Sequence, residues 1–328
     1  MRILLLVLPA CVATAPAARF PATPRQEPVR PSFGCRAPQP IVQGDRTLTS
    51  DGRTRRFRLV VPESARKGPA PLVLNIHGLA ETPALHEYYT AMDARAAERG
   101  MVVAYPQGIH NSWNAGNCCG RAMDEKVDDV RFLRDLVREI ESEICIDRAR
   151  VYATGMSNGA ILSYRLACEA SDVFAAIAPV AGTDAFSDCR PKRPVAVLAF
   201  NGTSDLLVRW EGSWSDLVPA HETVATWRER NRCSAQAATV YRQGDATCEA
   251  PRCAADTISC VIDGGGHTWP GAIVFPLLGH TSNDVDSTAT ILDFFLDHPL
   301  QRPQTSGRGL QARDQSPARS ASTIRSEN

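Results

Sequence analysis

Apolar runs that resemble strands alternate with helical stripes along the middle of this chain, and this alternation limits the possible folds most. The runs are short, continuous and rich in β-branched residues. Such runs are typical of strands that are buried on both faces of a parallel sheet. They are FRLVVP (57–62), LVLNIHG (72–78), MVVAYP (101–106), RVYATG (150–155), FAAIAPV (174–180) and VAVLAFNG (195–202).

Apolar residues at helical spacing lie between these runs. One stripe extends from Val130 to Ile144, a second follows residue 160, and a third covers 291–296. Strands that alternate with helices in this way build a doubly wound sheet. We therefore predict an α/β fold with a mostly parallel sheet in a single domain over residues 41–300. Its ligands should bind at the carboxyl ends of the strands.

The two ends of the chain have a different character. The stretch MRILLLVLPACVATAPAARF has one Arg, a short apolar block and then small residues, which is the layout of a secretory signal with Ala13-Thr14-Ala15 as a cleavage site. Within it, LPAC also matches a bacterial lipobox, with Cys11 as the lipidated residue. We predict a signal peptide at 1–18, a Pro- and Arg-rich linker at 19–40 and a disordered tail at 301–328.

Charge and hydropathy exclude some classes of partner. Lys plus Arg and Asp plus Glu number 36 each, so the net charge gives no reason to expect a nucleic-acid partner. No apolar run reaches the roughly 18 to 20 residues that a transmembrane helix needs. We expect neither nucleic-acid binding nor a transmembrane segment.

The cysteines favour an exported protein. Of the eleven cysteines, ten remain without Cys11, and an even number suits disulfides in an oxidising compartment. The spacing lacks the paired ligands of a zinc site, so we expect no metal. The pairing cannot be deduced, and the adjacent Cys118 and Cys119 could bond to each other or to distant partners.

The pentapeptide GMSNG places Ser157 between two glycines. RVYATG before it is strand-like and NGAILSYRLACEA after it is helical, so Ser157 is predicted to lie on a sharp strand-to-helix turn. Such a turn raises a serine hydroxyl above the sheet edge, beside a helix N-terminus that favours negative charge. Ser157 is therefore a candidate nucleophile, and the alternative is an ordinary serine in a Gly-rich turn.

A serine nucleophile needs a histidine base, and in an α/β-hydrolase that histidine comes late in the chain. His267 lies in DGGGHTWPG, directly after the strand-like TISCVI, so a glycine-rich loop presents it at a strand end. His280 is a weaker candidate. His298, at the end of the last helix, is expected to be a surface residue.

The acid should stand between the serine and the histidine in chain order. Asp205 comes a few residues after the run VAVLAFNG, where its carboxylate could reach the far nitrogen of His267. Asp184 and Asp188 follow the preceding strand and could instead cap or turn the chain. A surface turn is the alternative role for Asp205.

Two backbone amides are expected to form an oxyanion hole. One is the N–H of Asn158, directly after the serine, and the other belongs to the loop after LNIHG, where Leu79 is best placed. His77 in this loop precedes the serine in the chain. It is therefore expected to be structural rather than catalytic.

The ordered motifs of the chain resemble those of secreted esterases of the feruloyl esterase and poly(3-hydroxybutyrate) depolymerase family, which are α/β-hydrolases. The resemblance extends from about Thr49 to Phe295 and implies ester hydrolysis without a cofactor, through Ser157, Asp205 and His267. The segment LVRWEGSW (207–214) departs from the family pattern, so the acyl pocket is not determined. The motifs are NIHG, YPQG, SWNAG with CCG, VDDVRFLRDLV, IDRARVYATGMSNGA, FAAIAPVAG, FNGTSD and GGGHTWPG.

Tryptophans in the predicted loops suggest an aryl or sugar substrate. Four tryptophans lie outside the periodic helices: Trp113, Trp210, Trp214 and Trp269. Our candidate substrate-binding residues are Trp113, Trp210 and Trp269. With the resemblance, they predict a secreted feruloyl-esterase-like enzyme that cleaves hydroxycinnamoyl esters of plant cell-wall polysaccharide. The alternatives are a poly(3-hydroxybutyrate) depolymerase or short-chain aliphatic esterase, and a non-catalytic binding module.

Overall fold

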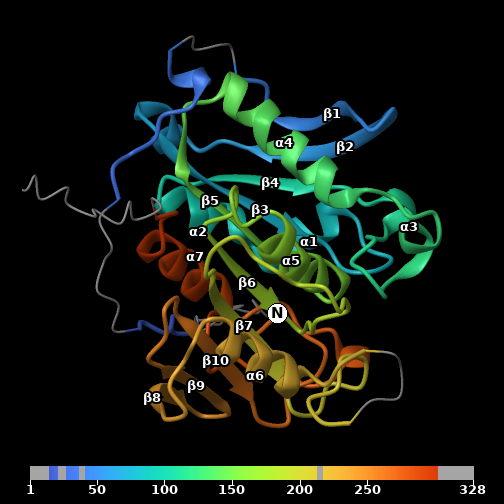
Figure 1. Cartoon of the computed structure of the whole chain (residues 1–328), viewed down its shortest axis with the longest axis vertical. Helices are drawn as coiled ribbons and strands as arrows, with labels where there is room; N and C mark the ends of the chain where they lie inside the picture. The colour runs from blue at the N-terminus through green and yellow to red at the C-terminus, as the bar shows by residue number, and fades with distance from the viewer. Residues whose placement is uncertain (1–14, 21–26, 37–40, 213–216, 302–328) are drawn as a thin grey trace, which may run out of the picture.

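The structure is a computed structural model that describes residues 15–20, 27–36, 41–212 and 217–301. Within these residues, ten strands form one sheet in the order β1-β2-β4-β3-β5-β6-β7-β10-β9-β8 (Figure 1). The strands are β1 (Gly44–Ser50), β2 (Arg53–Val60), β3 (Ala70–Ile76), β4 (Val102–Pro106), β5 (Ile146–Met156), β6 (Ala176–Val180), β7 (Ala196–Gly202), β8 (Ala237–Gln243), β9 (Ala246–Pro251) and β10 (Thr257–Ile262).

The centre of the sheet is parallel and its two margins are antiparallel. Neighbouring strands from β4 through β3, β5, β6 and β7 to β10 all pair in parallel. β1 and β2 continue the sheet beyond β4 in antiparallel pairing, and β9 and β8 do so beyond β10. The carboxyl ends of all the central strands therefore meet along one edge of the sheet, as the sequence predicts.

Helices cover both faces of this sheet. The helical segments are η1 (Phe33–Cys35), η2 (Glu63–Lys67), α1 (Pro83–Thr90), α2 (Met92–Glu98), η3 (Ile109–Asn111), α3 (Gly120–Asp124), α4 (Asp129–Glu143), α5 (Asn158–Glu169), α6 (Ala220–Arg230), η4 (Pro276–Leu278) and α7 (Ser287–Asp297). Apolar side chains of α4, α5 and α6 belong to one core cluster, and those of α1, α2 and α7 belong to the other.

Burial along the central strands explains their continuous apolar runs. Every residue of β4, β6 and β7 is buried, because each of these strands has a core on both faces.

Helix ends are set by local polar groups. The Asp128 carboxylate accepts from the N–H of Arg131 at the start of α4, and the Asp286 carboxylate accepts from the N–H of Ala289 at the start of α7.

The predicted linker at 19–40 is wrong for residues 27–36, which are part of the folded domain. Cys35 is bonded to Cys145, and the N–H of Ser32 donates to the carbonyl of Ile146. These contacts tie a segment without periodicity to the start of β5. Residues 16–18, predicted to end the signal peptide, also pack on the domain, since the Ala18 N–H donates to the Thr290 hydroxyl and Ala18 is buried.

Parts of the predicted signal peptide and linker (1–14, 21–26 and 37–40), with Cys11, and the tail from 302 lie outside the described residues. In the part of the chain that the structure describes, no helix is long and apolar enough to cross a membrane. The ten cysteines form the disulfides Cys35–Cys145, Cys118–Cys119, Cys168–Cys189, Cys233–Cys253 and Cys248–Cys260.

Candidate active site

Ser157 lies on the sharp turn between β5 and α5. Its backbone has φ 55° and ψ −121°, a conformation that non-glycine residues rarely adopt. A Cβ at either Gly155 or Gly159 would overlap the carbonyl oxygen of Ile76 on the neighbouring β3, so both flanking positions require glycine. The N–H of Ser157 donates to the carbonyl of Val180 at 3.0 Å, which fixes the turn against β6. This is the geometry of a nucleophile elbow.

Asp205 and His267 are in contact. Asp205 follows β7 and His267 follows β10, which is paired with β7, and the Asp205 Oδ2 lies 2.8 Å from the Nδ1 of His267. Both residues are buried, with 3% and 5% of their surfaces exposed. The backbone of His267 is held by its N–H, which donates to the carbonyl of Leu278 at 2.7 Å.

The pair occupies the same edge of the sheet as Ser157. The three residues follow β5, β7 and β10, which run parallel, with β6 between β5 and β7. Among the described residues, no hydrogen bond joins the Ser157 hydroxyl to His267, and the Nε2 of His267 has no partner. The structure therefore places an unbonded histidine nitrogen and an elbow serine at one strand-end edge.

Two backbone N–H groups remain available beside this edge. In the loop after β3, the N–H of Gly78 donates to the Glu81 carboxylate and that of Ala80 donates to the carbonyl of Asn111. The intervening N–H of Leu79 has no partner among the described residues, and neither has the N–H of Asn158, the first residue of α5. Both residues were predicted to supply oxyanion donors.

His77 has a structural environment, as predicted. Its Nε2 accepts from the N–H of Gly108 at 3.0 Å, so its Nδ1 must carry the proton that is donated to the carbonyl of Gly78 at 2.6 Å. Burial lowers the pKa of His77 to about 4, because a charged imidazolium would lose its hydration there. His77 is thus a neutral side chain that joins two loops.

The other candidate histidines are bonded elsewhere. The exposed His280 places its Nε2 2.6 Å from the Asp245 carboxylate. His298 was expected at the surface, but it is buried, with its Nδ1 2.6 Å from the carbonyl of Phe294 and its Nε2 2.8 Å from the Asp256 carboxylate. That expectation is wrong because the ring turns back over α7 and away from solvent.

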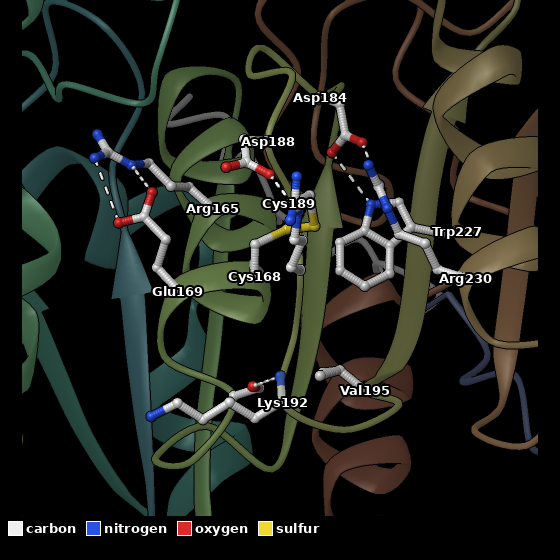
Figure 2. The surroundings of a disulfide bond; sticks show 12 residues. Arg165, Cys168, Glu169, Asp184, Asp188, Cys189, Lys192, Val195, Trp227 and Arg230 are labelled. Carbon is white, nitrogen blue, oxygen red and sulfur yellow. Dashed lines mark hydrogen bonds and ion pairs between the residues drawn. A yellow bond between two sulfur atoms is a disulfide. The ribbon is translucent and has the colours of Figure 1, made fainter.

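The alternative acids also have other partners. The buried Asp184 carboxylate accepts from the ring N–H of Trp227 at 3.1 Å and from the guanidinium of Arg230 at 2.7 Å (Figure 2). Asp188 is exposed and forms an ion pair with Arg190 at 2.8 Å. Both residues therefore have partners in the chain after β6 or in α6, and of the three candidate acids Asp205 is the one that contacts His267.

Two of the three candidate substrate-binding tryptophans are in the core. Trp113 is 0% exposed, and its ring N–H donates to the carbonyl of His77 at 2.9 Å. Trp269 is 2% exposed, and its ring N–H donates to the Thr288 hydroxyl. As direct substrate contacts these two predictions are wrong, because neither ring presents a surface to a ligand.

Trp210 remains a candidate for substrate contact. It is half-buried and lines a cavity of about 390 Å³ next to the catalytic-site candidate Asp205. Trp214 lies outside the described residues. Trp210 and Asp205 share one loop after β7, so a ligand in this cavity would contact that loop; neither Ser157 nor His267 lines the cavity.

Glu81 has a role in the site that the sequence does not indicate. Its carboxylate accepts from the N–H of Gly78 at 2.9 Å and from the hydroxyl of Tyr89 at 3.1 Å, and it lies 3.3 Å from His86. Burial by itself raises the pKa of the Glu81 carboxyl, but these partners outweigh burial and lower it. Glu81 fixes the loop that carries Leu79, and no spacing pattern in HGLAETP indicated this.

Comparison with known families supports an esterase. The sequence profile described as Esterase PHB depolymerase matches residues 56–204. A putative esterase, NocK, from Nocardia uniformis subsp. tsuyamanensis is 30% identical over 285 residues, which cover 76% of this chain and 82% of that protein. Feruloyl esterase B from Piromyces equi is 31% identical over 218 residues, and the match covers 60% of this chain but only 39% of that longer protein.

Solved structures support the fold. An acetyl xylan esterase from Aspergillus awamori aligns with 69% of this chain and 94% of its own, with a TM-score of 0.55 at 15% identity. That likeness concerns the fold, which is that of the α/β-hydrolases. Together with the elbow serine and the relatives, it places the chain in the feruloyl esterase and poly(3-hydroxybutyrate) depolymerase family of serine carboxylic-ester hydrolases.

Proposed function

We propose that Ser157, His267 and Asp205 form the catalytic triad of this ester hydrolase. The observation that carries the proposal is the buried hydrogen bond between Asp205 and the Nδ1 of His267 at the sheet edge that also bears the elbow serine. A carboxylate at Nδ1 holds the proton on that nitrogen and leaves Nε2 free to act as a base. The order Ser, Asp, His along the chain is that of the α/β-hydrolases.

The reaction would have two halves. In the first, Nε2 of His267 takes the proton of the Ser157 hydroxyl as its oxygen adds to the ester carbonyl. The C–O bond to the alcohol then breaks, and the alcohol leaves with the proton from His267. In the second, a water molecule gives one proton to His267 as its oxygen adds to the acyl-enzyme. The bond to Ser157 then breaks, the Ser157 oxygen takes the proton back from His267, and the acid is released.

The oxyanion of both tetrahedral intermediates would accept from the N–H groups of Leu79 and Asn158. Neither N–H has another partner among the described residues, so no existing hydrogen bond has to be broken before the oxyanion can bind. The N-terminus of α5, at Asn158, adds a favourable dipole for the developing charge. Preorganised donors of this kind contribute a large part of the rate enhancement in acyl transfer.

For the substrate, we propose hydroxycinnamoyl esters such as those of plant cell-wall polysaccharide. The cavity beside Asp205 contains the indole of Trp210, which can stack on an aryl acyl group. Several relatives are feruloyl esterases by name, among them those of Piromyces equi and Neurospora crassa. We propose that the protein is secreted, with lipid anchoring at Cys11 as the alternative, and its disulfides support an oxidising compartment.

A second candidate substrate is an aliphatic polyester such as poly(3-hydroxybutyrate). It is favoured by exposed apolar side chains on the loops that follow β3, β7 and β10, around the triad. A rim of this kind suits contact with an apolar polymer surface. These side chains, with their exposed fractions, are Leu79 (47%), Leu206 (72%), Leu207 (47%), Ile273 (46%), Val274 (51%) and Leu277 (100%).

Hydrolysis of methyl ferulate, compared with a 3-hydroxybutyrate oligomer, tests the proposal. Both rates should disappear in Ser157→Ala, and a preference for ferulate would support the aryl substrate. A preference for the oligomer would move the assignment to polyesters with the same triad. If neither ester is cleaved and a fluorophosphonate does not label Ser157, the protein is a binding module and the proposed function fails.

A further inference from the structure

The motif SWNAG lies between η3 and α3, and the proposed chemistry does not use it. Its tryptophan, Trp113, is fully buried and stacks on Phe132 with ring centroids 6.4 Å apart. A buried tryptophan in a loop could serve packing alone. Its hydrogen bonds point to a second role. All but one of them reach the two segments that carry the proposed oxyanion donors, and the remaining one lies within its own loop.

The first set of contacts joins Trp113 to the elbow. The backbone N–H of Trp113 donates to the Oδ1 of Asn158 at 2.7 Å, and the Nδ2 of Asn158 donates to the backbone carbonyl of Trp113 at 3.1 Å. The Asn158 side chain is buried, and Trp113 alone supplies the hydrogen-bond partners of both its polar atoms. These two hydrogen bonds set the orientation of Asn158, the first residue of α5, whose own backbone N–H is a proposed oxyanion donor.

The second contact joins Trp113 to the other donor loop. Its ring N–H donates to the carbonyl of His77 at 2.9 Å, and the two rings pack with centroids 4.9 Å apart. His77 is followed directly by Gly78 and Leu79. The indole therefore holds the peptide that leads into the proposed Leu79 donor.

The segment that carries Trp113 is itself held firmly. The N–H of Asn114 donates to the Asp129 carboxylate at 2.8 Å, and Asp129 forms a buried ion pair with Arg55 at 2.7 Å. The Arg165 guanidinium donates to the carbonyl of Asn114 at 2.8 Å. In addition, the N–H of Cys119 donates to the carbonyl of Trp113 at 3.1 Å.

We propose that Trp113 is a positioning residue that sets the relative placement of the Leu79 and Asn158 donors. This inference rests on the proposed function, since it assigns a device to the same oxyanion hole. One side of Trp113 holds Asn158 and the other holds the carbonyl before Leu79. Two donors from separate segments thus gain a fixed separation from a single residue that never touches the substrate.

Trp113→Phe tests this with little change in packing. Phenylalanine keeps the stacking on Phe132 and the backbone bonds to Asn158, but it removes the ring N–H that holds His77. The matched control is Trp227→Phe, because Trp227 is also 0% exposed and its ring N–H also makes one hydrogen bond, to Asp184 at 3.1 Å. Figure 2 shows this bond between Trp227, which lies on α6, and Asp184, which follows β6.

The readouts are kcat and KM for 4-nitrophenyl acetate and the affinity for phenylboronic acid, which forms a tetrahedral adduct with an active-site serine. Removal of an oxyanion donor costs about 10²- to 10³-fold in kcat, so a misplaced donor should cost about tenfold. We expect that loss in kcat for Trp113→Phe, a similar loss of boronate affinity and little change in KM, because ground-state binding does not depend on the oxyanion. Trp227→Phe should lower the melting temperature to a comparable extent and leave kcat unchanged.

Asn158→Ala is the second variant, since it keeps the backbone N–H and removes both side-chain bonds to Trp113. It should also lower kcat and boronate affinity without raising KM. Wild-type kcat in both folded variants, or an equal loss of kcat in Trp227→Phe, would overturn the inference. The proposed triad would still stand in that case if Ser157→Ala is inactive. If Ser157→Ala retains the activity of the wild type, the proposed function fails, and this inference fails with it.

Discussion

Asp205 and His267 are joined by a hydrogen bond of 2.8 Å, and the second oxygen of the same carboxylate is already in use. Oδ1 accepts from the N–H groups of Leu207 and Val208 at 2.8 Å each, and Oδ2 faces the Nδ1 of His267. The carboxylate therefore cannot rotate without losing three bonds. Its orientation, and through it the tautomer of the imidazole, is set by the loop after β7.

Asp205→Asn should lower kcat by about 10⁴-fold while the protein stays folded. The amide has the shape of the carboxylate, but it no longer favours a proton on Nδ1, and the corresponding change in a serine protease has an effect of this size. Steady-state kinetics on an activated ester, with circular dichroism as the check on folding, measure it.

Asp184→Asn is the control for that change. Asp184 is a buried carboxylate after the neighbouring strand β6, and its oxygens are bonded to Trp227 and Arg230. It should lower stability and leave kcat unaltered. A loss of kcat in Asp184→Asn, with Asp205→Asn active, would reverse the assignment of the acid.

The positions of the triad candidates could be predicted because they follow from chain order and strand ends. Ser157, Asp205 and His267 each come within a few residues of the end of an apolar run, and parallel strands bring such positions to one edge. Burial of the loop residues could not be predicted in this way. Trp113 and Trp269 are outside the periodic segments, yet both are in the core, since their environment depends on loops that no local pattern describes.

Strand β8, at one margin of the sheet, could not be predicted from the sequence pattern. β8 has half-buried and exposed residues in irregular order, so it shows neither a continuous apolar run nor the strict alternation that indicates a strand. Residues 27–36 are short and aperiodic, and a disulfide to Cys145 holds them. That partner is 110 residues away in the chain, so local composition indicated only a linker.

The buried His77 should make the protein less stable in mild acid. Its pKa in the folded state is lowered to about 4 from 6.5, so between these values the unfolded chain binds more protons. Stability is therefore complete above pH 6.5 and falls as the pH drops, by about 3 kcal/mol at pH 4. The comparison is with His77→Gln, which does not titrate and can still accept from Gly108.

Chemical denaturation over this pH range measures the effect. The free energy of unfolding of the wild type should decline more steeply than that of His77→Gln as the pH is lowered. Parallel declines would show that His77 is not held neutral in the folded protein.

The Cys35–Cys145 disulfide should contribute more stability than Cys233–Cys253. The first closes a loop of 110 residues and the second closes one of 20. The chain-entropy model gives about 5 and about 3 kcal/mol, because a longer closed loop removes more freedom from the unfolded chain. Double Cys→Ser variants of each pair, compared by thermal unfolding, test the order. If the Cys35–Cys145 variant melts like the wild type, residues 27–36 are not anchored in the way described.

Paired variants at the rim of the site should separate the two candidate substrates. Trp210→Ala removes the aromatic surface beside Asp205, and it should lower kcat/KM for methyl ferulate by roughly two- to tenfold, the value of one aromatic contact. Leu277→Ser changes a side chain that is 100% exposed, and it should leave methyl ferulate hydrolysis intact. On a solid polyester film, Leu277→Ser should lower the rate of hydrolysis more than Trp210→Ala does if the apolar rim binds polymer, since adsorption depends on exposed apolar area. Trp210→Ala with unchanged ferulate kinetics, together with Leu277→Ser that has lost film hydrolysis, would reject the aryl substrate and establish the polymer as the better one.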